Sequence, residues 1–195
     1  MKLYLSVALA ATMIAGTVTA QNVNLGIKAG LNVYNVNNDN GVKYDSKTGF
    51  HAGLIGHIHL GPQFGLQPEV VYSSQGAKFN APISNAETKY KLGYINVPVM
   101  LQYMFDNGFR LQAGPQVGFL INAETEVNGK STDVKQDRKT VDFGVGAGIG
   151  YVHTPSGVGV DARYNLGLSN INENNNIKST NRGLQVGVFY LFKHK

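Results

Sequence analysis

The ten residues Gly183-Leu184-Gln185-Val186-Gly187-Val188-Phe189-Tyr190-Leu191-Phe192 decide the fold class of this 195-residue chain. Apolar residues recur there at every second position and alternate with small or polar ones: Leu184, Val186, Val188, Tyr190 and Phe192 against Gly183, Gln185 and Gly187. This period is typical of a β-strand with one apolar face and one small or polar face. Because the stretch closes a chain that begins with an export signal, it favours the last strand of an outer-membrane barrel.

The first twenty residues have the features of a cleaved signal peptide. A positive start, Met1-Lys2, precedes an apolar run from Leu3 to about Ile14, and small residues lead up to Ala20. The run is too short for a membrane-spanning helix. We therefore expect cleavage after Ala20 and a single barrel domain over residues 21–195, a length sufficient for one domain.

The composition is unusual for a soluble domain. Gly accounts for 24 residues, charged residues make up only 15%, and Cys is absent. No stretch after residue 20 approaches the roughly 20 apolar residues of a spanning helix, so an exported chain that crosses a bilayer must form a closed barrel. The net charge of +5 comes from scattered basic residues without a basic run or an aromatic platform, so nucleic acid is not an expected partner.

Period-two alternation predicts eight strands. Their ranges are 23–36, 49–60, 64–79, 89–105, 109–123, 139–152, 157–169 and 183–192. The connections between them alternate long and short, and outer-membrane barrels have short periplasmic turns and longer outside loops. The sequence therefore predicts an all-β fold, an eight-stranded antiparallel up-and-down transmembrane β-barrel with short periplasmic turns and long extracellular loops. Aromatic residues near the predicted periplasmic strand ends suit an interfacial girdle: Phe64, Phe105, Phe109, Tyr151, Tyr190 and Phe192.

Two local features of this barrel are expected. Tyr90 and Leu92 are out of phase with the apolar set that follows them, which predicts a β-bulge near Gly93. A turn at residues 153–156 would set Gly148 opposite Asp161 and Gly146 opposite Arg163. Glycine at those positions would leave room for long side chains from the neighbouring strand, or would let the sheet curve tightly.

Six short segments follow one another in order along the chain: Gly26-Ile27-Lys28-Ala29-Gly30-Leu31-Asn32, Leu66-Gln67-Pro68-Glu69-Val70-Val71-Tyr72-Ser73-Ser74-Gln75-Gly76, Tyr94-Ile95-Asn96-Val97-Pro98, Ala113-Gly114-Pro115, Asp142-Phe143-Gly144 and Tyr164-Asn165-Leu166-Gly167-Leu168. Together they resemble the recurring segments of the PorT-like outer-membrane β-barrel proteins of Bacteroidetes-type bacteria. The resemblance implies an eight-stranded barrel in the outer membrane. It implies little about function, since most such proteins are uncharacterised and a few are linked to protein secretion.

If the apolar faces contact lipid, the opposite faces fill the lumen. The ionisable side chains expected there are Lys28, His57, His59, Glu69, Arg110, Asp142, Asp161 and Arg163. Leaving out histidine, they comprise three positive and three negative charges. An eight-stranded barrel is just wide enough to be filled by its own side chains, and buried charges must pair or be hydrated. We expect a structural polar network; the alternative is a narrow or gated polar path.

Other chemistry has weaker support. His57 and His59 share one strand face with Glu69 expected nearby, which is a possible metal trio, although lumenal histidines are more often hydrogen-bond partners. His153, Thr154 and Ser156 are close in sequence, but their turn is expected in the periplasm, and no serine–histidine–carboxylate set falls within one predicted site. We expect no catalytic, metal or cofactor site.

Three functional hypotheses follow. The favoured one is a structural or surface-interaction protein of the outer membrane, with the Asn-rich loops as contact surface. The second is a small pore or a secretion-associated component. The third is a soluble secreted β-barrel that binds an apolar ligand, with its apolar faces inside. The expected partners are outer-membrane lipid, the barrel-assembly machinery during insertion and an extracellular partner at the loops, and the expected state is a monomer.

Overall fold

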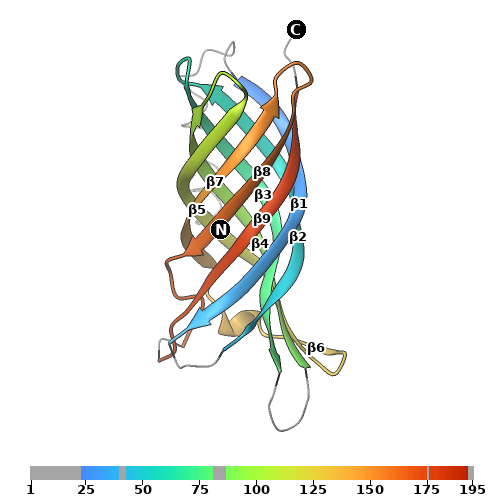
Figure 1. Ribbon diagram of the computed structural model, residues 1–195. Helices are drawn as coiled ribbons and strands as arrows, with labels where there is room; N and C mark the ends of the chain where they lie inside the picture. Colours follow the sequence, from blue (N-terminus) through green and yellow to red (C-terminus); the bar gives the residue numbers. More distant parts are fainter. Residues whose placement is uncertain (1–22, 40–42, 81–86, 175, 193–195) are drawn as a thin grey trace.

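The computed structural model describes residues 23–39, 43–80, 87–174 and 176–192, and shows one tall barrel (Figure 1). The expected signal peptide, residues 1–20, lies outside the described residues. The elements are β1 (Val23–Asn38), β2 (Asp45–His59), β3 (Phe64–Asn80), β4 (Glu87–Met104), β5 (Phe109–Val127), β6 (Lys130–Asp133), the 3-10 helix η2 (Lys135–Asp137), β7 (Val141–His153), β8 (Val158–Gly167) and β9 (Ser179–Leu191). Within this part of the chain, no helix has the length and apolarity needed to span a membrane.

The barrel wall closes through antiparallel pairing of neighbouring strands. The strand order is β4-β3-β2-β1-β9-β8-β7-β5, and pairing of β4 with β5 completes the ring. The first and last strands pair over most of their length, from Gly26 with Leu191 to Asn38 with Ser179. The wall therefore has the eight strands that the sequence predicts. The short strand β6, which pairs only with β5, was not expected.

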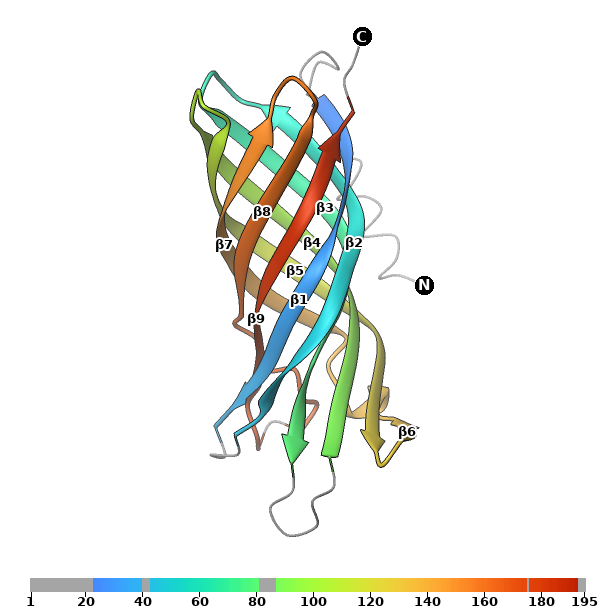
Figure 2. The same ribbon diagram turned by 45° about the vertical axis from the view of Figure 1, so that its right-hand side comes forward.

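The two ends of the barrel differ. The short-turn end, at the top of Figures 1 and 2, carries the connections 60–63, 105–108 and 154–157. The long-loop end carries the β1–β2, β5–β7 and β8–β9 connections. There β3, β4 and β5 reach beyond the other strands, and β6 and η2 lie beside the end of β5 (Figure 2). The alternation of short and long connections matches the predicted one.

The outer wall of the barrel is apolar and its lumen is polar. On β1, Ile27 is 48% exposed while Lys28 is 3% exposed, and the same alternation continues through Leu31 and Asn32. The exposed apolar side chains form a belt around the barrel, and they include Leu54, Val70, Leu101, Leu111, Ile149, Val160 and Val186. A soluble barrel with an apolar interior needs the reverse arrangement, so the third hypothesis, of a secreted apolar-ligand carrier, is wrong.

The bulge near Gly93 is present, but its extra residue lies on the neighbouring strand. Gly93 pairs with Asn122 and Tyr94 pairs with Leu120, so Ile121 of β5 is the unpaired residue. The expected change of phase within β4 is wrong, because Leu92 and Tyr94 are both buried inside the barrel. The apolar residues in this half of β4 pack in the lumen instead of facing outward.

The register of the β7–β8 hairpin differs by two residues from the prediction. His153, which the prediction placed in the turn, pairs with Val158. The loop therefore comprises residues 154–157 and ends at Gly157, whose φ of +77° lies in the left-handed region that favours glycine. Arg163 is therefore opposite Gly148, and Asp161 is opposite Gly150. Glycine still leaves space beside the arginine: a Cβ on Gly146 would lie 3.2 Å from Arg163 Cδ.

Candidate functional site

The lumen is filled in three layers along the barrel axis. An apolar cluster occupies the long-loop end: Val36, Ala77, Leu92, Tyr94, Leu120, Ala123 and Ile171. Ile171 comes from the β8–β9 connection and is almost fully buried, so this loop closes the end over the cluster. A second apolar cluster, Ile55, Val152, Phe189 and Leu191, lies toward the short-turn end. Polar and charged side chains fill the space between them.

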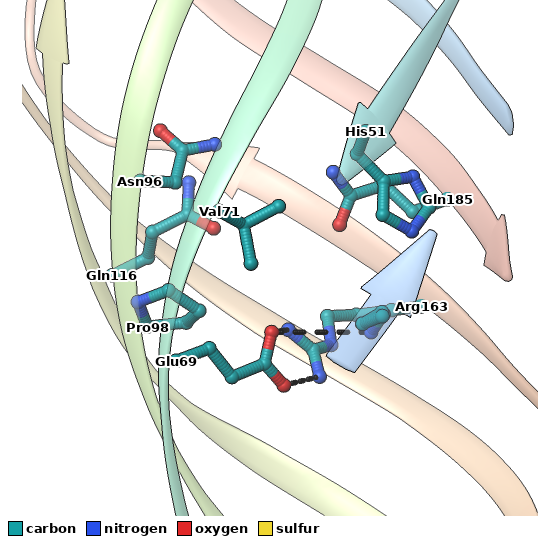
Figure 3. Close-up of a pocket in the computed structure, with 9 residues that line it drawn as sticks. His51, Glu69, Val71, Asn96, Pro98, Gln116, Arg163 and Gln185 are labelled. Carbon is teal, nitrogen blue, oxygen red and sulfur yellow. Dashed lines mark hydrogen bonds and ion pairs between the residues drawn. The ribbon is translucent and has the colours of Figure 1, made fainter. Parts of the chain in front are cut away.

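A bidentate ion pair between Glu69 and Arg163 forms the centre of the polar layer (Figure 3). Arg163 Nη2 donates to Glu69 Oε1 at 2.6 Å, and Nη1 donates to Oε2 at 3.1 Å. Both side chains are 1% exposed. Paired, nearly parallel N–H···O bonds are the strongest arrangement that arginine and a carboxylate can adopt. The pair therefore meets the requirement that charge buried in the lumen be compensated.

Two further charges complete a neutral quartet. Lys28 forms an ion pair with Asp161. Lys28 Nζ also lies 3.9 Å from Glu69 Oε2, and Arg163 Nη2 lies 3.8 Å from Asp161 Oδ2. Each cation thus contacts both carboxylates. We call Lys28, Glu69, Asp161 and Arg163 the central quartet; it carries two charges of each sign.

Glutamine side chains surround the quartet and make further hydrogen bonds to Glu69 and Arg163, while Arg163 Nε and Asp161 Oδ1 are buried without a hydrogen-bond partner among the described residues. Gln67 Nε2 donates to Glu69 Oε1 at 2.8 Å, and Arg163 Nη2 donates to Gln112 Oε1 at 2.9 Å. Gln102 Nε2 in turn donates to Gln67 Oε1 at 2.9 Å. The gap beside the quartet leaves no volume for a water molecule. The side chains themselves fill this level of the barrel.

A second buried group, which the predicted site omits, lies next to the quartet. His51 Nδ1 is 2.7 Å from Asn32 Oδ1, and Asn32 Nδ2 donates to Ser73 Oγ at 3.0 Å. His51 alternates with Phe50 and Ala52, so the period-two pattern places its side chain on the inward face. This alternation was the sequence signal by which His51 could have been included among the lumenal residues. Tyr34 and Asn165 form another such pair, with Asn165 Nδ2 donating to the tyrosine hydroxyl at 3.0 Å.

The predicted residues Arg110, His57 and His59 lie apart from the quartet, at the short-turn end. Arg110 Nη1 donates to Gln102 Oε1 at 3.2 Å and lies 3.5 Å from His57 Nδ1. The rings of His57 and His59 meet edge to face, 4.5 Å between centroids. His57 is fully buried, whereas His59 is exposed at the rim of the barrel mouth.

The possible metal trio is not assembled. Glu69 pairs with Ile55 across β2 and β3, two residues away from His57, and its carboxylate is engaged by Arg163. Nowhere among the described residues do three His, Cys, Asp or Glu side chains lie in positions that could hold a metal ion.

Asp142, the last of the predicted residues, lies near the long-loop end. It accepts hydrogen bonds from Ser169 Oγ at 2.6 Å and from Asn181 Nδ2 at 2.9 Å. The structure thus brings four of the eight predicted residues together in the quartet. It places Arg110 with the two histidines at one end of the barrel, and Asp142 at the other.

The β7–β8 turn brings His153 and Ser156 together. His153 Nδ1 lies 2.9 Å from Ser156 Oγ, which also donates to the His153 carbonyl oxygen and accepts from the Val158 N–H. These bonds are of the kind by which serine stabilises a turn.

The fold and the sequence both resemble known outer-membrane proteins. The barrel is similar to Neisserial surface protein A, with a TM-score of 0.56 and 18% identity over 86% of this chain and 97% of that one. It is also similar to Ail, the attachment invasion locus protein of Yersinia pestis, with a TM-score of 0.51 and 18% identity over 88% of this chain and all of that one. A complex of Ail with the heparin analogue sucrose octasulfate gives a TM-score of 0.54 at 16% identity, over the same shares of both chains.

No curated protein sequence matches the chain. At these identities the solved structures show a shared fold only, and many functions use one fold. The sequence model of the outer membrane protein beta-barrel domain matches residues 19–173, most of the chain. The protein therefore belongs to the outer membrane protein beta-barrel domain family, and it is located in the outer membrane.

Proposed function

We propose that this protein is a surface-interaction component of the outer membrane, in which the barrel is the anchor and the long-loop end is the contact surface. The observation that carries the proposal is the length of β3, β4 and β5 at that end (Figure 2). Strand β5 has 19 residues. At about 3.3 Å per residue and a tilt of about 40°, it rises roughly 45 Å.

The apolar band of an outer-membrane barrel is only about 25 Å tall, so roughly 20 Å of β5 stands outside the membrane. The outer face of this projecting part is charged. Lys91 donates a hydrogen bond to Glu126, and Lys89 Nζ lies 3.5 Å from the same carboxylate. These bonds hold the pKa of Glu126 below its usual range. Since longer loops of such barrels face outward from the cell, this projection is exposed to the exterior.

The charge of the projecting end indicates the kind of partner. The segments 35–48, 76–92, 122–140 and 169–182 contain eleven basic and eight acidic residues. A surplus of positive charge steers anionic partners toward a surface. Ail, a barrel of similar fold, forms a complex with a sulfated heparin analogue. We therefore propose that the partner is anionic and choose heparin as the first probe.

The test uses the full chain displayed in the outer membrane of a Gram-negative host. Cells that display the protein should adhere to immobilised heparin, and adhesion should fall with added salt. A variant with residues 128–137 replaced by a short Gly-Ser linker keeps the barrel wall and should lose adhesion. Equal adhesion of the linker variant and the wild type, or wild-type adhesion no greater than that of empty cells, would argue against the proposal.

The other functional hypotheses have less support. A pore needs an open path, and the two apolar clusters and the central quartet fill the lumen between the ends. A link to protein secretion rests only on the resemblance to PorT-like proteins of Bacteroidetes-type bacteria.

We also propose a monomer surrounded by outer-membrane lipid and inserted by the barrel-assembly machinery, because the exposed apolar belt extends around the wall. An enzymatic role finds no support in the His153–Ser156 contact, since its bonds are those of a turn.

A further inference from the structure

A cavity of about 120 Å³ lies at the short-turn end of the barrel, the end that faces the periplasm. Its lining comprises Asn24, His57, His59, Arg110, Val152, Thr154, Gly157, Leu191 and Phe192. A single water needs roughly 10–15 Å³, so this space accommodates a small polyatomic ligand or several waters. The cavity is separate from the gap beside the central quartet, which leaves no volume for a water molecule.

The charge in this cavity has no acidic counterpart among the residues that the structure describes. Arg110 supplies a full positive charge, and its hydrogen-bond partners, Gln102 and His57, are neutral amide and imidazole groups. Within the described part of the chain, no lining residue carries a carboxylate. The buried acids Glu69 and Asp161 are already paired with Arg163 and Lys28. A partly buried cation without an anionic partner creates a favourable position for an anion.

Two imidazoles add hydrogen-bonding capacity beside the guanidinium. His57 Nδ1 lies 3.5 Å from Arg110 Nη1, so the ring accepts from the arginine there and carries its proton on Nε2. That Nε2 is buried and has no hydrogen-bond partner among the described residues. The exposed ring of His59 packs edge to face against His57 at the rim of the same cavity. Arginine with adjacent imidazole donors is a chemistry suited to oxyanions, because guanidinium matches two oxygens at once.

We propose that Arg110, His57 and His59 form a binding site for a phosphate-type oxyanion at the periplasmic mouth of the barrel. The same chemistry would hold free inorganic phosphate or the phosphate of a lipid headgroup that reaches the mouth from the inner leaflet of the outer membrane. The site lies at the opposite end of the barrel from the projecting loops, so it is independent of the proposed surface interaction.

The test is an NMR titration of the folded full chain, labelled at the histidine rings, in uncharged maltoside micelles. Added inorganic phosphate should shift the His57 and His59 resonances in a saturable way. Arg110→Gln should weaken this binding by at least about tenfold, because it removes the charge-assisted bonds. Arg182→Gln, an exposed arginine near the long-loop end, is the matched control and should bind like the wild type.

A second titration, with phosphatidylglycerol added to the same micelles, separates the two sources of phosphate. Saturation by inorganic phosphate assigns the site to a free anion, and saturation by the lipid alone assigns it to a headgroup. If neither inorganic phosphate nor the lipid gives saturable shifts, the proposal is overturned. Unchanged phosphate binding by Arg110→Gln overturns it as well. If Arg110→Gln lacks the heat-dependent gel shift of a folded barrel, His59→Ala decides, since His59 is exposed at the rim. The His59→Ala variant should bind phosphate more weakly than the wild type. An unchanged affinity would mean that the anion does not bind in this cavity.

Discussion

Glu69 and Arg163 stand on opposite walls of the barrel and meet across its full width. Their strands, β3 and β8, are separated by three strands in either direction around the ring. The two side chains nevertheless form two hydrogen bonds, of 2.6 Å and 3.1 Å. The ion pair therefore connects parts of the wall that share no backbone pairing.

Replacing Arg163 with leucine should destabilise the barrel. The change would leave the carboxylates of Glu69 and Asp161 with only Lys28 as a counter-charge, and removal of one partner from a buried ion pair costs about 3–5 kcal/mol. Urea unfolding in lipid vesicles measures the effect, and binding at the cell surface should not change. An unchanged unfolding midpoint would mean that the quartet contributes nothing to stability.

The double variant Glu69→Leu with Arg163→Leu is the matched control for that prediction. It removes one charge of each sign, and the Lys28–Asp161 pair stays neutral. We expect it to be more stable than Arg163→Leu alone, because hydrophobic replacement of a whole buried ion pair is often neutral. A double variant as unstable as the sum of the two single changes would indicate that steric packing, and not charge, sets the cost.

Substitution of Val160 with arginine tests the lipid-facing wall. Val160 is 49% exposed and points outward from β8. Arginine there should cost about 2–4 kcal/mol if the position lies near the bilayer midplane. The control Val158→Arg, two residues closer to the short-turn end on the same face, should cost less. An equal loss of unfolding free energy at both positions, measured in lipid vesicles, would mean that Val160 does not lie nearer the bilayer midplane than Val158.

The wild-type protein should show no steady unitary conductance in planar bilayers. The quartet and its glutamines leave no volume for water at the centre of the barrel, and Phe189 and Leu191 narrow the lumen toward the short-turn end. A porin in the same bilayers is the positive control. Reproducible unitary steps from the purified protein would show that the lumen opens, and would restore the pore hypothesis.

Acid should loosen the projecting part of β4 and β5. The bonds from Lys91 and Lys89 lower the pKa of Glu126, so their stabilisation is present above the ordinary glutamate pKa and is lost as the pH falls through the lower, folded value. Amide exchange at residues 124–127, corrected for the intrinsic effect of pH, should accelerate below about pH 4. The variant Glu126→Gln should show no such acceleration of amide exchange. An acceleration in this variant would mean that a group other than Glu126 causes the effect of acid.

The strands could be predicted because the wall obeys one local rule. Alternation along β1 or β9 reports directly which side chains face lipid, and long and short connections report the direction of each strand. The rule fails where apolar residues face the lumen, as at Leu92 and Tyr94, since periodicity does not distinguish lipid from an apolar plug. Strand β6 was missed because its four residues are polar and exposed, without alternation.

The partners within the lumen could not be predicted by the same means. Which charges meet depends on the register of each strand around the ring, and a two-residue error in one hairpin moves Asp161 and Arg163 by one inward position. The sequence indicated a balanced set of charges. It contained no local signal that Arg110 would lie apart with His57, or that Asp142 would be held by Ser169 and Asn181.

The quartet also has a consequence for the order of assembly. Glu69 and Arg163 are 94 residues apart in sequence, and Lys28 and Asp161 are 133 apart. Contacts between such distant residues form late, because closing a long loop costs entropy before any contact is gained. In a half-assembled sheet Lys28 and Glu69 have only each other, and they lack the charges of Asp161 and Arg163 until β8 arrives opposite β3. The quartet thus favours a barrel in which β8 has reached its place opposite β3 over any partly closed intermediate.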